Sequence, residues 1–284
     1  MLFIILSVIQ SVLILVTFKM FDRYRIDNLQ AIVVNYIVAG TIGFTVSSQR
    51  PSPGLLIHYD WFSVALFLGI LFISTFFVFA LSSQKAGIAI TSVSSKISLI
   101  VPVIASIFLF GELLNWQRST GILLALASFY LIFTGREKIS WKAGYTWLPV
   151  LVFFGNGLVD TTMKYADHHY IKDDLVLFLA VVFTTSFVIG LAIFIIRLFN
   201  GKERFQWKSI AGGAFLGMIN FGSTYYMLKA ISVYESAVVF PVTNASIVGI
   251  SVLIGFFAFR EKLNWINWTG IICAVFSIII IANA

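Results

Sequence analysis

Charged residues are scarce in this sequence: Asp, Glu, Lys and Arg together make up 11% of its 284 residues, whereas 60% are hydrophobic. A soluble domain of this length could not bury so much apolar surface in a single core. The mean hydropathy of +0.98 therefore excludes a water-soluble protein. It indicates an integral membrane protein that leaves no room for a separate soluble domain.

Cysteine and histidine are nearly absent, which limits metal and redox chemistry. The only cysteine, Cys273, cannot form an intrachain disulfide. Two of the three histidines lie in the segment DHHYIKDD, residues 167–174, which we interpret as a solvated loop because its spacing matches no zinc pattern. The chain contains no phosphate-binding Gly-Lys-Ser/Thr loop and no plausible Ser-His-Asp arrangement. We therefore expect no cofactor, no metal site and no enzymatic activity.

Long apolar runs dominate the chain instead. A run of about 20 residues can cross a bilayer as a helix, and these runs are hydrophobic on all sides rather than along one stripe. They lack the alternation typical of membrane β-barrel strands. We predict an all-α integral membrane protein with ten transmembrane helices, near residues 2–20, 28–47, 61–81, 86–109, 118–135, 147–166, 175–197, 209–229, 233–259 and 266–283.

The excess of basic residues concerns topology rather than nucleic acid. Almost all Lys and Arg residues behind the formal charge of +7 lie in short breaks between the apolar runs, so we expect no nucleic-acid partner. Thirteen of them fall in connections that follow odd-numbered helices, and five fall in the others. By the positive-inside rule, the odd-numbered connections are cytoplasmic and both termini face outward.

The two halves of the chain repeat one another. The segment GELLNWQRSTGILLALASFYLI, from Gly111, matches REKLNWINWTGIICAVFSIIII, from Arg260, in Glu, Leu-Asn-Trp and Thr-Gly at one constant offset. Weaker echoes pair DWFSVALFLG with QWKSIAGGAFLG and TFKMFD with TMKYAD. We predict two five-helix repeats, residues 1–139 and 140–284. Because five is odd, the second repeat enters the membrane from the opposite side, so the repeats are inverted.

At these residues the chain resembles the EamA-type members of the drug/metabolite transporter superfamily. Pro102, Gly111, Glu112 and Gly121 fit the family's pattern of a proline, a Gly-Glu pair at the end of the fourth helix and a glycine-containing fifth helix. The second half departs from this pattern at Arg260, where the glycine would be. The resemblance implies a secondary transporter for small metabolites or drugs, often an exporter, with a central cavity built from both halves. It also implies cytoplasmic termini, opposite to the charge count, so the orientation stays open.

Lys96 is the most unusual residue inside a predicted span. An ammonium group near the bilayer midplane costs about 2.5 to 3.5 kcal/mol, so it needs water or a polar partner. Ser92, Ser95 and Lys96 share one helical face by their spacing of three and four, and we expect this face to line a cavity. Asp160 is the only acidic residue well inside a span and is the candidate counter-ion. Asn156 lies four residues before it, on the same face.

Each of these residues also has a purely structural interpretation. Lys96 and Asp160 either lock two helices as an ion pair or bind substrate or a proton. Membrane-buried Ser, Thr and Asn often form interhelical hydrogen bonds worth about 0.6 kcal/mol on average. Lys164, at a span end, is expected to extend toward the interface, and Glu112, at a helix end, to make a capping or loop contact. The candidate substrate-binding residues are Lys96, Ser92, Ser95, Asp160, Asn156, Gln10, Asn220 and Asn244.

These observations predict a secondary active transporter that moves a small polar metabolite by alternating access from a central midplane cavity, and the family resemblance implies that it is an exporter. Its expected partners are the substrate, a coupling proton and the lipid bilayer of the plasma or inner membrane. The alternative within transport is a multidrug or cation exporter, in which Asp160 and the many Phe residues recognise the substrate. Outside transport, the alternative is a membrane scaffold or sensor subunit.

Overall fold

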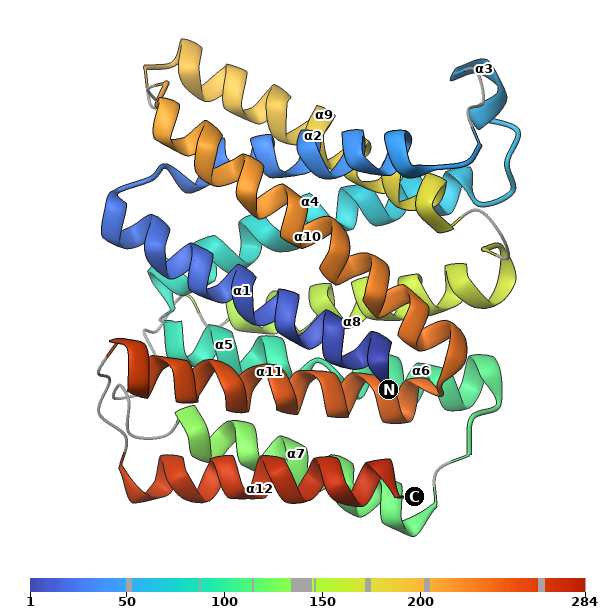
Figure 1. The fold of residues 1–284 in the computed structure, drawn as a ribbon, viewed down its shortest axis with the longest axis vertical. Helices are drawn as coiled ribbons and strands as arrows, with labels where there is room; N and C mark the ends of the chain where they lie inside the picture. The colour runs from blue at the N-terminus through green and yellow to red at the C-terminus, as the bar shows by residue number, and fades with distance from the viewer. Residues whose placement is uncertain are drawn as a thin grey trace. The chain divides into compact units, whose positions relative to one another are not determined.

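The fold was obtained as a computed structural model. It describes residues 1–49, 53–86, 88–113, 115–133, 145, 147–171, 175–201, 205–259 and 264–283. Every regular element among these residues is an α-helix, which confirms the all-α prediction (Figure 1). In chain order the helices are α1 (Leu2–Tyr24), α2 (Asn28–Val46), α3 (Pro53–Leu56), α4 (Phe62–Lys85), α5 (Ile88–Ile97), α6 (Ile100–Phe110), α7 (Trp116–Phe133), α8 (Trp147–His169), α9 (Leu175–Phe199), α10 (Trp207–Val233), α11 (Ser236–Phe259) and α12 (Trp265–Ala282).

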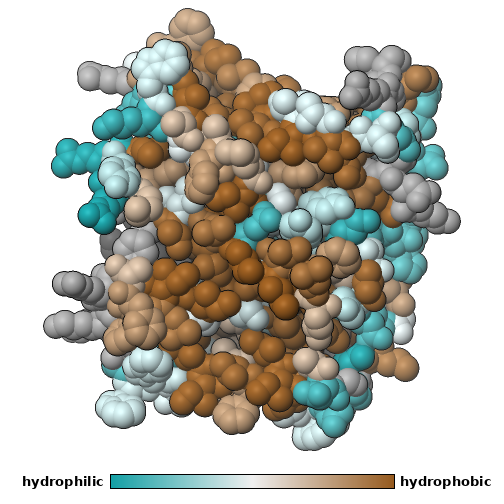
Figure 2. All heavy atoms as spheres, viewed as in Figure 1, coloured by the Kyte–Doolittle hydropathy of each residue, from teal (hydrophilic) through white to brown (hydrophobic). Residues whose placement is uncertain are grey.

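Five helical stretches among the described residues are long and apolar enough to cross a membrane. They are α2, Phe62–Phe79 of α4, α9, Ser236–Ala258 of α11, and α12. Shorter apolar stretches occur at Leu2–Phe18 and Ser94–Phe110. The chain is therefore a membrane protein by its helices, whereas the number of ten spans stays a prediction. On the face shown in Figure 2, hydrophobic side chains cover most of the surface, and hydrophilic ones gather mainly at its left and right margins, with a smaller group near the centre.

The predicted fourth helix is divided into two, α5 and α6. Pro102 lies in the first turn of α6, and its missing N–H leaves the carbonyl of Ser98 without the usual partner four residues later. Val101 N–H donates to that carbonyl at 2.9 Å instead, and Leu99 N–H makes a long bond of 3.4 Å to Lys96 O. The chain therefore tightens locally just after Lys96.

The chain folds into two compact units that do not coincide with the sequence halves. Unit 1 comprises Met1–Ile73 and Tyr165–Lys229, and unit 2 comprises Ser74–Lys164 and Ala230–Ala284. The chain passes from one unit to the other within α4, α8 and α10. Each unit therefore contains helices from both predicted repeats. The predicted repeat boundary, at residues 139 and 140, falls outside the described residues.

In unit 2, α7 and α12 pack side by side (Figure 1). Gly121, near the start of α7, lies against Ile281 at the end of α12. Gly270, near the start of α12, lies against Ile132 at the end of α7. The two helices therefore run antiparallel. Gly270 follows Gly121 by 149 residues, as Ile281 follows Ile132, and this is the offset of the sequence repeat. The two contacts are thus repeat counterparts of each other.

The repeated Leu-Asn-Trp segments start these two helices. The side-chain oxygen of Asn115 accepts a hydrogen bond from Arg118 N–H at 2.7 Å, and that of Asn264 accepts one from Asn267 N–H at 2.8 Å. Both asparagines therefore cap a first helical turn, where backbone N–H groups have no partner within the helix. The repeated Asn thus has the same capping role in both halves.

In unit 1, α2 packs against α9 in an antiparallel pair. Gly40 lies against Thr184 and Gly43 against Ala180, so residue numbers rise along α2 as they fall along α9. Small residues allow two membrane helices to approach closely. By the predicted repeat, α2 and α9 are counterparts, as α7 and α12 are. Each unit therefore contains one pair of packed helices that are repeat counterparts of each other: α2 with α9 in unit 1, and α7 with α12 in unit 2.

Candidate functional site

Lys96 lies at the centre of a polar cluster in unit 2. Its Nζ atom donates a hydrogen bond to Asn244 Oδ1 at 3.1 Å, which joins α5 to α11. The Asn244 side chain is itself held in place, because its Nδ2 atom donates to Phe240 O, one turn earlier in α11, at 3.0 Å. The ammonium group in this apolar stretch therefore has the polar partner that its position requires.

A second hydrogen bond joins the same part of α5 to α8. Asn156 Nδ2 donates to Ser95 Oγ at 3.1 Å and to Val152 O, one turn earlier in α8, at 3.1 Å. The neighbouring residues Ser95 and Lys96 thus connect α5 to two different helices. The structure brings together four of the predicted site residues: Lys96, Ser95, Asn156 and Asn244.

Asp160, the predicted counter-ion, is not the direct partner of Lys96. It lies one turn after Asn156 in α8 and within electrostatic range of Lys96. No ion pair within 4.0 Å joins Lys96 and Asp160, both of which belong to the described residues. The partner that Lys96 contacts is instead a neutral amide. Its positive charge is therefore not cancelled by a contacting carboxylate. Ser92 lies in α5, one turn before Lys96, and its side chain is outside the described residues.

The remaining predicted residues, Gln10 and Asn220, lie in unit 1. Asn220 Nδ2 donates to Asn35 Oδ1 at 3.1 Å and joins α10 to α2. Gln10, in α1, lies against Gly222 in α10. Its Oε1 atom is buried and has no hydrogen-bond partner within the part of the chain that the structure describes. The contacts of these two side chains thus lie within unit 1.

Further polar contacts join α1 to α10 in unit 1. Ser11 Oγ and Ser223 Oγ lie 2.8 Å apart, and Ser7 Oγ donates to Ser223 O at 3.2 Å. In unit 2, Gly155 of α8 lies against Thr75 of α4. The sequence repeat matches Thr75 with Thr224, the neighbour of Ser223. The polar pairs Ser74–Thr75 and Ser223–Thr224 therefore both lie at or next to helix contacts.

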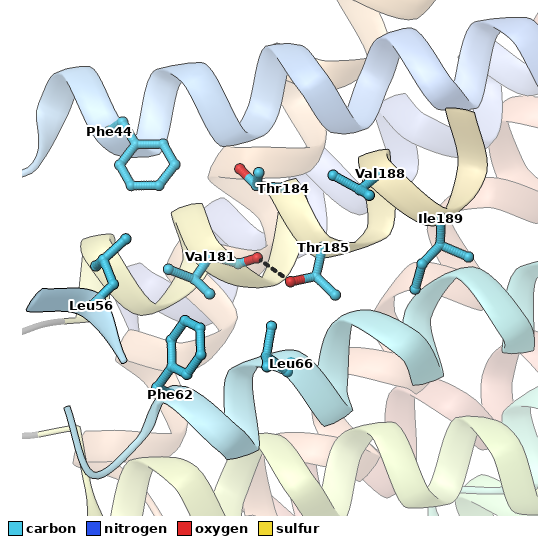
Figure 3. Close-up of a pocket in the computed structure, with 9 residues that line it drawn as sticks. All are labelled: Phe44, Leu56, Phe62, Leu66, Val181, Thr184, Thr185, Val188 and Ile189. Atoms are coloured by element: carbon cyan, nitrogen blue, oxygen red, sulfur yellow. Dashed lines mark hydrogen bonds between the residues drawn. The ribbon is translucent and has the colours of Figure 1, made fainter. Parts of the chain in front are cut away.

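A groove of about 320 Å³ in unit 1 is apolar and contains no predicted site residue (Figure 3). Its Thr185 hydroxyl already donates to Val181 O at 2.8 Å. Val188 is 58% exposed and Leu66 is 36% exposed, so the groove opens to the surface of unit 1. Such a groove suits hydrocarbon rather than a small polar metabolite. Its lining residues are Phe44, Leu56, Phe62, Leu66, Val181, Thr184, Thr185, Val188 and Ile189.

The histidine-containing segment gives no metal site among the described residues. No group of three His, Cys, Asp or Glu residues there lies close enough together to hold an ion. His169 packs against Tyr165, with ring centroids 4.4 Å apart, at the end of α8. Asp173 and Asp174 lie outside the described residues.

Lys164 differs from the sequence prediction. Its residue is only 8% exposed, and Nζ donates to Ile231 O at 2.8 Å and lies 3.8 Å from Glu112 Oε1. The prediction that it extends toward the interface is wrong, because these two partners hold the ammonium group inside unit 2. Glu112 makes the helix-end contact expected of it. The one feature of the sequence that sets Lys164 apart is its position in TMKYAD, a segment that weakly repeats TFKMFD of the first half.

The chain is similar to proteins of known family and fold. Residues 144–283 match the model of the EamA-like transporter family, which confirms the resemblance to the drug/metabolite transporter superfamily in the second half of the chain. Over 286 residues the chain is 27% identical to an uncharacterized protein of Haemophilus influenzae (strain ATCC 51907 / DSM 11121 / KW20 / Rd), with 96% of this chain and 95% of that protein covered. A crystal structure of a protein with 13% sequence identity matches with a TM-score of 0.79 and covers 98% of this chain and 94% of its own. At that identity the likeness shows the fold alone.

Proposed function

We propose that this chain, whose residues 144–283 match the EamA-like transporter family, is a secondary active transporter for a small anionic metabolite. The family match and the apolar helices support a membrane transporter of the drug/metabolite type. The substrate class and the transport mechanism are proposals that rest on the polar cluster around Lys96.

The observation that carries the substrate class is the hydrogen bond from Lys96 to Asn244. Asn244 offers a neutral amide oxygen, so its hydrogen bond to the ammonium group lacks the direct attraction between opposite charges that an anion adds. A carboxylate or phosphate that reaches this cluster therefore displaces the amide oxygen from Lys96. The substrate would exchange one partner of Lys96 for a stronger one, so the ammonium group is never left unpaired in the membrane.

Ser95, Asn156 and Asp160 complete the proposed site. The Ser95 hydroxyl and the Asn156 amide offer hydrogen-bond donors and acceptors beside Lys96. Asp160 disfavours a second negative charge at its end of the cluster. This arrangement favours a substrate with one anionic group and polar groups elsewhere.

Alternating access between the two sides of the membrane is the proposed mechanism. Many transporters achieve it with two similar halves related by an axis in the membrane plane. The reciprocal contacts of Gly121 with Ile281 and of Gly270 with Ile132 support such a relation, because each contact is the other moved by the repeat offset. The break between α5 and α6, directly after Lys96, also supports it, since discontinuous helices commonly form transporter sites.

A cation or multidrug exporter is the second candidate, favoured by Asp160 and the 29 Phe residues of the chain. Lys96 lies within electrostatic range of Asp160 and would repel a cationic substrate there. Export and residence in the plasma or inner membrane remain parts of the proposal, and proton coupling through Asp160 is a further part. A scaffold or sensor subunit would not need the matched polar residues of the repeats.

The test is uptake into proteoliposomes that contain the purified protein. Pools of radiolabelled carboxylates, phosphorylated metabolites and cationic drugs are offered to the parent, to Lys96→Met and to Lys96→Arg. We expect uptake of an anion by the parent, loss of it in Lys96→Met and partial uptake in Lys96→Arg. Lys208→Met, which removes an exposed lysine at the start of α10, serves as the control. Equal uptake of an anion by the parent and Lys96→Met would contradict the proposed role.

A further inference from the structure

Glu112 is buried at the end of α6 and reaches the start of α11. Gly111 ends α6 in the left-handed region, at φ +66°, which residues with a side chain rarely adopt. The Glu112 residue that follows is 8% exposed. Its carboxylate accepts a hydrogen bond from Ser236 N–H at 2.9 Å on one oxygen and from Ala237 N–H at 3.1 Å on the other. Glu112 therefore caps the first turn of α11 from a distant part of the sequence.

Lys164, in α8, holds the adjacent helix end. Its Nζ atom donates to Ile231 O, in the last turn of α10, at 2.8 Å and lies 3.8 Å from Glu112 Oε1. It also lies 5.8 Å from the centre of the Phe110 ring, on α6. Because Lys164 is buried, water cannot readily replace these partners of its ammonium group. A buried charge without such partners would be strongly destabilising.

The two charges match the helix ends that they contact. The N-terminus of a helix carries a partial positive charge and favours a carboxylate, whereas the C-terminus carries a partial negative charge and favours an ammonium group. Since α10 ends at Val233 and α11 begins at Ser236, Glu112 and Lys164 bracket the turn between them. Arg118 and Glu235 form a second ion pair at this turn, but Glu235 is more exposed, at 47% for its side chain.

The first turn of α11 depends on such an anchor. Pro241 lies inside α11 and has no N–H to donate to Ala237 O, so one backbone bond between the first turn and the rest of the helix is missing. Asn244 lies eight residues after Ser236, about 12 Å further along the helix. A displacement of the first turn that carries the rest of α11 with it would change how Asn244 meets Lys96.

We infer that Glu112 and Lys164 are positioning residues for transport, which fix the start of α11 and thereby place Asn244 against Lys96. This inference rests on the proposed function, in which Lys96 and Asn244 form the substrate site. Among the described residues, no hydrogen bond or ion pair joins Glu112 or Lys164 to Lys96 or Asn244. Their effect passes through α11.

Hydrogen exchange of the purified full-length protein tests the first step. Glu112→Gln keeps the shape of the side chain but loses the charge and one acceptor, so we expect the amides of residues 236 and 237 to exchange roughly tenfold faster than in the parent. Asp60→Asn removes an exposed carboxylate of unit 1 and should leave this exchange unchanged. Unchanged exchange in Glu112→Gln would overturn the inference. If that variant does not fold, Glu112→Asp replaces it, with an intermediate increase expected.

A charge exchange separates this role from that of a simple ion pair. The double variant Glu112→Lys with Lys164→Glu keeps opposite charges together but places each against the wrong helix end. We expect it to exchange at least as fast at residues 236 and 237 as Glu112→Gln. Recovery of the parent's slow exchange in the double variant would overturn the capping role.

The second step is tested at Lys96 itself. Mass spectrometry gives the rate at which N-hydroxysuccinimidyl acetate acylates Lys96, relative to the exposed Lys208. We expect Glu112→Gln to raise this ratio by roughly threefold or more, and to have no such effect in an Asn244→Ala background, because the coupling passes through Asn244. An unchanged ratio would overturn the positioning role. These measurements use no substrate, so their failure is distinct from a failure of the uptake test.

Discussion

The ammonium group of Lys96 donates a hydrogen bond to the side-chain oxygen of Asn244, 3.1 Å away, although the two residues are 148 positions apart. Asn244 is the repeat counterpart of Ser95, the neighbour of Lys96. The bond therefore joins corresponding places in the two predicted repeats. It also gives a membrane-buried cation a neutral partner. Substitutions at Lys96 and at Asn244 therefore test different properties: the cation itself and the neutrality of its partner.

Replacing Lys96 with Met should separate function from stability. Burying an ammonium group costs several kcal/mol, whereas the Asn244 side-chain oxygen that Lys96→Met leaves without its donor costs about 1 to 3 kcal/mol. We expect Lys96→Met to unfold at the same or a higher temperature than the parent while transport is lost. Thermal unfolding in detergent and uptake into liposomes measure the two properties. A clear loss of stability in Lys96→Met would identify Lys96 as a structural residue instead.

Replacing Asn244 with Asp should give Lys96 a permanent anionic partner. The parent's bond to a neutral amide lacks charge–charge attraction, which a carboxylate at this position adds to the hydrogen bond. We expect Asn244→Asp to be at least as stable as the parent but to bind an anionic substrate more weakly, because the new carboxylate competes for Lys96. Asn244→Ala should weaken binding much less. If Asn244→Asp took up the anion as well as the parent, Lys96 would not be the anion-binding group.

Removing the charge of Asp160 should affect coupling and affinity in opposite directions. Asp160 lies within electrostatic range of Lys96, so an ionised Asp160 would repel an anion bound there. We expect Asp160→Asn to bind the anion more tightly and to exchange it across the membrane, but to lose accumulation driven by a proton gradient. Counterflow and gradient-driven uptake distinguish the two activities. Accumulation equal to that of the parent would remove Asp160 from the coupling mechanism.

The close packing of α7 and α12 should not tolerate an added methyl group. A Cβ atom at Gly270 would lie 2.8 Å from the backbone nitrogen of Ile132, whereas one at Gly249 would meet nothing within 4 Å. We expect Gly270→Ala to lower stability by about 1 to 3 kcal/mol through overpacking. The matched control Gly249→Ala should be neutral or stabilising by about 0.5 to 1 kcal/mol. Equal thermal unfolding of the two variants would contradict the packing described here.

The depth of a residue can be predicted from the sequence, but its lateral neighbours cannot. Helical rise alone places Lys96 and Asp160 at similar heights. Which helices lie next to α5 depends on tertiary packing, so the contact of Lys96 with Asn244 is not predictable from the sequence. The repeat offset, in contrast, pairs Gly121 with Gly270 in the sequence itself, because the same close contact constrains both halves.

The structure differs from the sequence prediction at two further places, the predicted fourth helix and Lys164. The apolar run around Pro102 predicts one continuous helix, but the missing N–H of this proline divides it into α5 and α6. Hydropathy considers each side chain without its partners. It therefore predicts that the charged end of Lys164 extends to the membrane interface. Its burial depends on Glu112 and on the end of α10, which only the fold brings together.

Thermal unfolding of the purified protein with a library of small metabolites tests the central claim most directly. A ligand at about 100 times its Kd stabilises the folded form by about 2.7 kcal/mol. We predict that an anionic metabolite raises the Tm of the parent and of Lys208→Met, and leaves the Tm of Lys96→Met unchanged. Stabilisation of Lys96→Met to the same extent as the parent, or stabilisation of the parent by cationic compounds alone, would contradict the account.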